Sequence, residues 1–169
     1  AARFIYLNRT CFNGLYRVNS KGHFNVPFGQ YKNPRILDED NLRKVHLLLN
    51  NGKDILIEHT DYKKVLEYAK EGDFIYFDPP YYPLDPTSFT SYTKDNFGPE
   101  EHKELAAVFK ELTDRGCMVA LSNSSTEEVR KLYSFDGVEL VPLQARRSIN
   151  SDVNGRGAIE ELLIINYKL

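Results

Sequence analysis

The chain has 169 residues, 41% of them hydrophobic and 27% charged, and a net charge of −2. This length allows one globular domain, or a domain with a small appendage, and excludes two domains of ordinary size. No apolar run reaches the roughly 20 residues that a membrane span needs, and there is no signal-peptide pattern, so we expect a soluble, cytoplasmic protein. The two cysteines and four histidines lack metal-ligand spacing, which argues against a zinc site.

The charges are segregated along the chain. Residues 1–37 contain six basic side chains and no acidic one, so this segment carries +6 and the remainder carries −8. Aromatic residues lie between the basic ones. Positive charge interleaved with aromatic rings is what contact with a phosphate backbone requires. The segment therefore predicts nucleic-acid binding.

The first part of the chain combines helices with turns. A helix over residues 1–14, ending near Gly14, is predicted by apolar side chains near a 3.6-residue spacing, namely Phe4, Leu7, Cys11 and Leu15. Turn signals at 20–22 and 27–29 predict a hairpin or an irregular ribbon. Asp40 is expected to cap a helix that runs to about Asn51.

From Ile55 onward, short apolar strands alternate with amphipathic helices. Strands are predicted at 55–58, 73–77 and 118–122, and helices at 60–70 and 99–116. This alternation is typical of a parallel sheet that helices cover on both faces, so the fold class is α/β. The last two strands, at 138–143 and 159–167, follow each other directly and predict an antiparallel pair at the sheet edge.

The stretch FIYFDPPYYP, residues 74–83, places a carboxylate, two prolines and two tyrosines directly behind a strand. Ligands of open α/β sheets bind beyond the carboxyl ends of the strands. Pro79 and Pro80 lack N–H donors, so the carbonyl oxygens remain free to accept. Asp78 and a carbonyl side by side suit an amino group with two hydrogens, such as a base amine, and Tyr81 would stack on the base. The alternative is a plain turn with half-buried tyrosines.

These residues resemble a known family. FIYFDPPY is similar to the (D/N)PP(Y/F) signature of the amino-methyltransferases, and LNRTCFNGLYRVNSKGHFNVPFGQYKNP and RRSINSDVNGRGAIEELLIINY resemble segments of Dam-type DNA adenine methyltransferases. The resemblance implies methyl transfer from S-adenosylmethionine to N6 of adenine in GATC. It implies a partial Rossmann-like sheet with a small helical and hairpin recognition subdomain. Asp78 and the Pro79 carbonyl would contact the target amine, Tyr81 the flipped adenine, and Asp78 would lie near the cofactor.

The resemblance also implies contacts to double-stranded DNA in the first segment. Phe12 would be an aromatic wedge that enters the base stack. Leu15, Arg17 and Pro27 would read base edges, and Asn19 and Tyr31 would contact the DNA backbone. A surface salt bridge is the alternative for Arg17.

Two further predictions are less specific. The loop 146–156 contains Arg146, Arg147 and one further arginine against a single aspartate, so it is expected to clamp phosphates, although a solvated edge loop would look similar. Asp61 follows a predicted strand and is expected to line the cofactor pocket, or else to be a helix N-terminal charge.

The resemblance implies that a segment of the enzyme is missing. The family's Lys-bearing N-terminal segment and glycine-rich FxGxG loop hold most of the cofactor, and nothing of that type precedes Ala1. We therefore predict a recognition subdomain at 1–52, a catalytic portion at 53–169 and an absent N-terminal cofactor-binding segment. Two alternatives stay open: a non-catalytic DNA-binding subunit, and an RNA or cytosine amino-methyltransferase. The sequence leaves the biological role open between restriction-modification, repair marking and phage defence.

Overall fold

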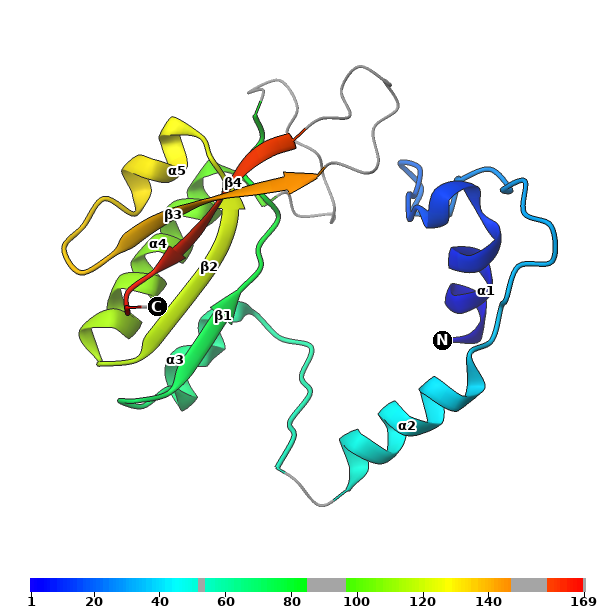
Figure 1. The fold of residues 1–169 in the computed structure, drawn as a ribbon, viewed down its shortest axis with the longest axis horizontal. Helices are drawn as coiled ribbons and strands as arrows, with labels where there is room; N and C mark the ends of the chain where they lie inside the picture. The colour runs from blue at the N-terminus through cyan, green and yellow to red at the C-terminus, as the bar shows by residue number, and fades with distance from the viewer. Residues whose placement is uncertain (52–53, 85–96, 147–157, 169) are drawn as a thin grey trace. The chain divides into compact units, whose positions relative to one another are not determined.

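A computed structural model of the chain describes residues 1–51, 54–84, 97–146 and 158–168. The chain divides into two compact units, Ala1–Glu58 and His59–Leu169 (Figure 1). The first compact unit ends at Glu58, six residues after the predicted end of the recognition subdomain at residue 52. The functional roles assigned to the two parts remain predictions.

The first unit is built from short helices and an irregular ribbon. Its elements are the helices α1 (Ala2–Thr10) and α2 (Glu39–Asn50) and the 3-10 turn η1 (Phe12–Gly14). Isolated bridges pair Cys11 with Phe28 and Val18 with Phe24, so the predicted ribbon is confirmed.

Both helices of this unit differ from the predicted bounds. Helix α1 ends at Thr10 because Cys11 is extended and the next amide, that of Phe12, donates to the Pro27 carbonyl oxygen at 2.8 Å. Helix α2 begins at Glu39, one residue before the predicted cap, so Asp40 lies in its first turn instead of capping it. Asp38 occupies the cap position and forms an ion pair with Arg35 at 2.8 Å.

The strand predicted at 55–58 is wrong. These residues have neither helical nor strand structure, and the exposed fractions of Leu56 and Ile57 are 70% and 74%. An extended segment becomes a strand only when a neighbour takes up its backbone hydrogen bonds. The local β propensity of this segment was therefore not sufficient to make it a strand.

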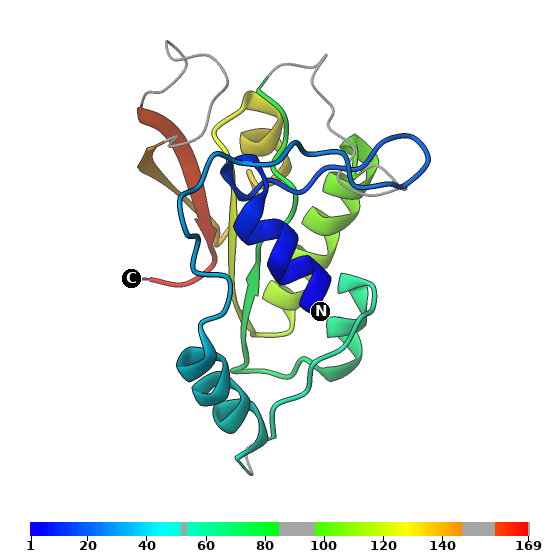
Figure 2. The same ribbon diagram turned by 90° about the vertical axis from the view of Figure 1, so that its right-hand side faces the viewer.

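The second unit holds a four-stranded mixed sheet in the order β1-β2-β4-β3 (Figures 1 and 2). The strands are β1 (Phe74–Phe77), β2 (Met118–Ser124), β3 (Glu139–Arg146) and β4 (Ala158–Ile165). Strands β1 and β2 are parallel, whereas β4 pairs antiparallel with both β2 and β3. The α/β class and the antiparallel final pair are confirmed, with β3 at the edge.

Four helical segments accompany the sheet: η2 (Tyr62–Lys64), α3 (Val65–Tyr68), α4 (Pro99–Asp114) and α5 (Glu127–Leu132). Helix α5 was not predicted, although Ser-Thr-Glu-Glu is a helix-start pattern. Its cap is Thr126, whose hydroxyl oxygen accepts from the Val129 amide at 3.3 Å. Within the described ranges, no helix is both long and apolar enough to cross a membrane.

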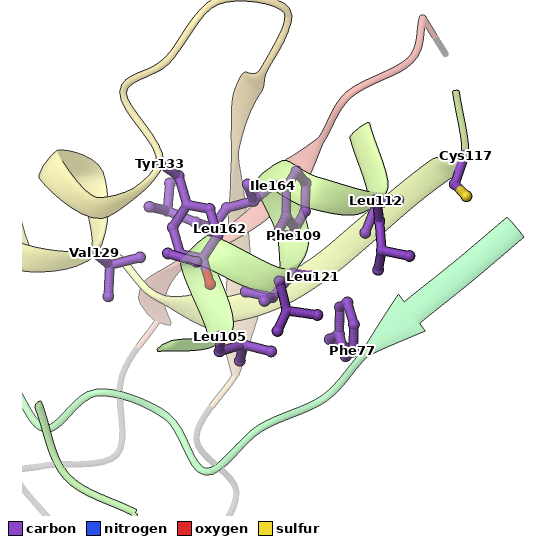
Figure 3. Close-up of a cluster of buried hydrophobic side chains, with 13 residues drawn as sticks. Phe77, Leu105, Phe109, Leu112, Cys117, Leu121, Val129, Tyr133, Leu162 and Ile164 are labelled. Atoms are coloured by element: carbon purple, nitrogen blue, oxygen red, sulfur yellow. The ribbon is translucent and has the colours of Figure 1, made fainter. Parts of the chain in front are cut away.

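The core lies on one face of the sheet. Figure 3 shows side chains from α4, α5 and the strands meeting in one cluster, in which Phe109 and Leu112 of α4 and Leu121 of β2 are fully buried. On the opposite face, Phe74 and Tyr76 of β1 are 58% and 54% exposed. The expectation that helices cover both faces is therefore wrong for this unit as described.

Candidate functional site

The predicted acceptor group lies at the carboxyl end of the sheet. Asp78 directly follows β1, and because β1 and β2 are parallel, the end of β2 lies beside it. The Ser122 hydroxyl of β2 donates to Asp78 Oδ1 at 2.9 Å and accepts from the Tyr76 hydroxyl at 3.1 Å. A serine hydroxyl therefore holds one oxygen of the carboxylate.

The next residues of the motif are fastened to the same strand end. Asn123 Oδ1 accepts from the Tyr82 amide at 2.8 Å, and the Ser124 hydroxyl donates to the Tyr82 carbonyl oxygen at 2.6 Å. Tyr81 is 39% exposed. Burial raises the pKa of Tyr81. The Tyr81 ring thus keeps an accessible surface, while the main chain of the following residue, Tyr82, is fixed.

A cavity of 660 Å³ adjoins the motif. Asp61 and Asp78, which were predicted from separate parts of the sequence, both line it, together with Pro79 and Pro80. The Asp61 carboxylate also accepts from the Lys63 amide at 2.9 Å and caps η2. The interpretation of Asp61 as a helix N-terminal charge is thus confirmed. Its position in the cavity wall is also compatible with the prediction that it lines a cofactor pocket.

The cavity wall combines carboxylates with aromatic rings. The rings of Phe77 and Phe97 lie 6.5 and 6.2 Å from that of Tyr62, centroid to centroid, and all three residues line the cavity. Glu101 and Glu104 lie on the same wall, and Glu104 is paired with Lys63 at 2.5 Å. Flat rings and an excess of carboxylates suit a ligand that carries both a heteroaromatic ring and a positive charge.

Glu101 also fixes the start of α4 beside the cavity. Its Oε2 accepts from the Gly98 amide at 2.8 Å, and hydrogen bonds from backbone amides lower the pKa of its carboxyl. The Tyr62 hydroxyl donates to the Glu101 carbonyl oxygen at 3.5 Å, which links η2 to α4. The two elements on either side of the cavity are thereby connected.

The predicted DNA-contacting residues of the first unit lie on its surface. Phe12 is 51% exposed and Leu15 is 41% exposed. Exposure of large apolar side chains to water is unfavourable in free energy. The exposure of Phe12 and Leu15 is therefore compatible with contact to a partner. The Phe12 amide donates to the Pro27 carbonyl oxygen, which brings these two predicted residues together.

Arg17 is held by an amide and not by an acid. Its Nε donates to Asn25 Oδ1 at 2.9 Å and its Nη2 donates to the Asn25 carbonyl oxygen at 3.1 Å. Among the described residues, the one ion pair from the basic 1–37 segment is that of Arg35 with Asp38. A salt bridge of Arg17, the alternative interpretation, is therefore not observed.

The two predicted backbone-contacting residues differ in their surroundings. Asn19 Oδ1 accepts from the amides of Lys21 and His23, both at 3.0 Å, so the oxygen of this side chain stabilises the turn. Tyr31 is 46% exposed and lines a cavity of 480 Å³ that also contains Arg9. Both residues are exposed, but the side-chain oxygen of Asn19 is already engaged in the turn.

The predicted phosphate clamp can be followed only at its start. Arg146 is the last residue of β3 and pairs with Ala158 of β4, while Arg147 lies outside the described residues.

Sequence reasoning missed Ser122, Asn123 and Ser124. The signal was present, because polar residues at the end of a strand parallel to β1 must lie beside the residues that follow β1.

Comparison with known proteins gives consistent results. A family described as D12 class N6 adenine-specific DNA methyltransferase matches residues 1–149. The chain is 45% identical over 168 residues to Type II methyltransferase M1.LlaDCHI of Lactococcus lactis subsp. cremoris and 48% identical over 169 residues to Type II methyltransferase M.MjaIII of Methanocaldococcus jannaschii. It is 34% identical over 169 residues to the DNA adenine methylase of Escherichia coli K12. The matches cover 98–99% of this chain but only 57–58% of these relatives.

Proposed function

Because this chain belongs to the D12 class of N6 adenine-specific DNA methyltransferases, we propose that it forms the DNA-recognition and amine-binding part of an enzyme that methylates adenine N6 within GATC. The observation that carries the proposal is the group at the end of β1, where Asp78 and a Pro-Pro pair line an aromatic-walled cavity. A site of this kind binds a group that only donates hydrogen bonds. The exocyclic amine of adenine is such a group.

The residues of this chain would act mainly by orientation. Asp78 and the Pro79 carbonyl would accept the two hydrogens of the amine, which makes the nitrogen more tetrahedral and its lone pair available. Tyr81 would stack on the extruded base, a contact worth about 1–3 kcal/mol, and so offset part of the few kcal/mol that extrusion costs. No strong base is needed, since the nitrogen loses a proton readily after transfer.

We propose S-adenosylmethionine as the methyl donor. When bound, this cofactor supplies a methyl group on a positively charged sulfur. The cavity beside Asp78 fits it in two respects, because carboxylates favour a sulfonium cation and aromatic side chains favour a flat adenine ring. Asp61 and Asp78 are the residues that we assign to it.

Recognition of GATC would belong to the first unit. Phe12 is proposed to wedge into the base stack, and Leu15, Arg17 and Pro27 to read base edges. The contact between Asn25 and Arg17 supports this, because it orients the guanidinium without neutralising its charge. Asn19, Tyr31, Arg146 and Arg147 are proposed to contact the phosphate backbone, which supplies most of the sequence-independent affinity.

We further propose that a segment N-terminal to these residues completes the cofactor site. The chain spans less than two thirds of the relatives it matches. Strand β1 lies at one end of the sheet, and Phe74 and Tyr76 on its open face are more than half exposed. A strand at the edge of a sheet, with exposed aromatic residues on one face, is a surface on which a further strand and its helix would pack.

The proposal is tested by following labelled methyl transfer from S-adenosylmethionine to a GATC duplex. The 169-residue chain and a longer form with its N-terminal segment are compared, with a fully methylated duplex as control. Incorporation into the unmethylated duplex alone, at N6 of adenine, is expected from the longer form. Label in cytosine instead of adenine would refute the proposal.

In the same assay, Asp78→Ala tests whether Asp78 acts in methyl transfer and not in DNA binding. Loss of the carboxylate should abolish transfer while DNA affinity stays within about twofold, because the recognising residues are elsewhere. Asp136→Ala, a surface change in the same unit, is the matched control. Parallel loss of transfer and DNA binding in the Asp78 variant would contradict the assigned role.

A further inference from the structure

The end of β2 carries three consecutive polar residues that all hydrogen-bond to the segment 78–82. Ser122 holds the Asp78 side chain, and Asn123 and Ser124 hold the Tyr82 main chain. Ser124 and Asn123 are 5% and 0% exposed, so the two contacts to Tyr82 are sheltered from water, whereas the contact of Ser122 with Asp78 is exposed. Three bonds from one strand end to one short motif fix both its side chain and its backbone.

Each of the bonds has a distinct geometric effect. The Ser122 hydroxyl takes one acceptor site of Asp78 Oδ1, so the remaining acceptor capacity of the carboxylate is left for a ligand. The Tyr76 hydroxyl donates to Ser122, so Ser122 is left with its own hydrogen to give to Asp78. The pair on Tyr82 uses both the amide and the carbonyl of one residue, which fixes the two peptide planes on either side of Tyr82.

We infer that Ser122 and Ser124 are positioning residues of the methyl-transfer site, acting through Asp78 and through the main chain beside Tyr81. This inference rests on the function proposed above. A carboxylate on an exposed strand end has free rotation about its side-chain bonds, and a Pro-Pro-Tyr-Tyr segment without anchors can shift as a body. Displacement of an orienting group by about 1 Å can cost about a hundredfold in rate, so such anchors govern the chemical step more than binding.

The test uses the form of the protein that methylates DNA in the experiment above. Ser122→Ala should lower the single-turnover rate of methylation by roughly ten- to a hundredfold, with the dissociation constants for DNA and for S-adenosylmethionine within about twofold of wild type. Ser124→Ala should act in the same direction. Ser122→Thr, which retains the hydroxyl on a strand position, should restore most of the rate.

The matched control is Ser134→Ala. The Ser134 hydroxyl also donates a hydrogen bond, to the Lys131 carbonyl oxygen at 2.9 Å, but it lies on the surface after α5. This variant should methylate at the wild-type rate.

The outcomes separate the inference from the proposed function. A wild-type protein that never methylates adenine refutes the function. A methylating wild type with an equally fast Ser122→Ala variant overturns the inference alone. A fall in the melting temperature and in both affinities that parallels the loss of rate also overturns it, since Ser122 would then have only a structural role.

Discussion

Replacing His102 by leucine should remove a pH dependence of folding stability between about pH 6.5 and about pH 4. The His102 ring is 1% exposed and lies between the rings of Tyr82 and Phe97, at centroid distances of 5.1 and 4.8 Å. Among the described residues, neither of its ring nitrogens has a hydrogen-bond partner. Burial lowers the pKa of His102 from 6.5 to about 4, and the neighbouring Glu101 charge only partly opposes this effect.

The size of the effect follows from that difference in pKa. Above pH 6.5 the imidazole is neutral in both the folded and the unfolded chain, so it contributes no pH dependence. Below this value the unfolded chain binds a proton that the folded chain excludes, so stability is lost as the pH falls toward 4. At 1.36 kcal/mol for each pKa unit, the complete loss is about 3 kcal/mol.

Urea unfolding followed by circular dichroism at a series of pH values measures this loss. The relevant quantity is the wild-type free energy of unfolding minus that of His102→Leu, which cancels the carboxylates common to both proteins. This difference should fall as the pH is lowered. His59→Leu, at an exposed position, serves as the control and should leave the pH dependence as in wild type. Parallel curves for wild type and His102→Leu would refute the reasoning.

Three more predictions concern the core, a close backbone approach and DNA reading. Phe109→Ala should lower the free energy of unfolding by about 3–5 kcal/mol in urea titrations, because this ring is fully buried. In Gly29→Ala the added Cβ would collide with the Tyr31 ring and the Cys11 carbonyl oxygen, so thermal melting of the first unit should occur at a lower temperature. Arg17→Ala should cost about 1–3 kcal/mol of GATC affinity in fluorescence anisotropy and relax discrimination at one base pair.

Local patterns in the sequence were sufficient to predict strand β1, which the Asp-Pro-Pro motif follows. Four apolar residues followed by Asp-Pro-Pro end a strand, because two prolines cannot continue a ladder of hydrogen bonds. The amphipathic helix at 99–114 was equally readable, since Gly98, Pro99 and Glu101 mark its start. For these elements, the physical cause of the structure lies within the element itself.

Other features depend on partners that are distant in sequence. The segment 55–58 has the composition of a strand but no strand structure in the described chain. The insertion of β4 between β2 and β3 also joins segments that are far apart, through Leu121 with Ile164 and Leu140 with Ile164. A periodicity describes which face of a segment is apolar. It does not say which segment will cover that face.

The candidate site combines both kinds of information. Asp78 could be identified from its neighbours in the sequence, whereas Ser122, 44 positions later, becomes its hydrogen-bond partner only once β1 and β2 are paired in parallel. The register of Phe77 with Leu121 brings the next residue of each strand to the same edge. When a motif follows a parallel strand, the polar residues at the carboxyl end of the next strand are therefore its first candidate partners. Applied to this sequence, that rule selects Ser122, Asn123 and Ser124 from the fold class and one strand pairing alone.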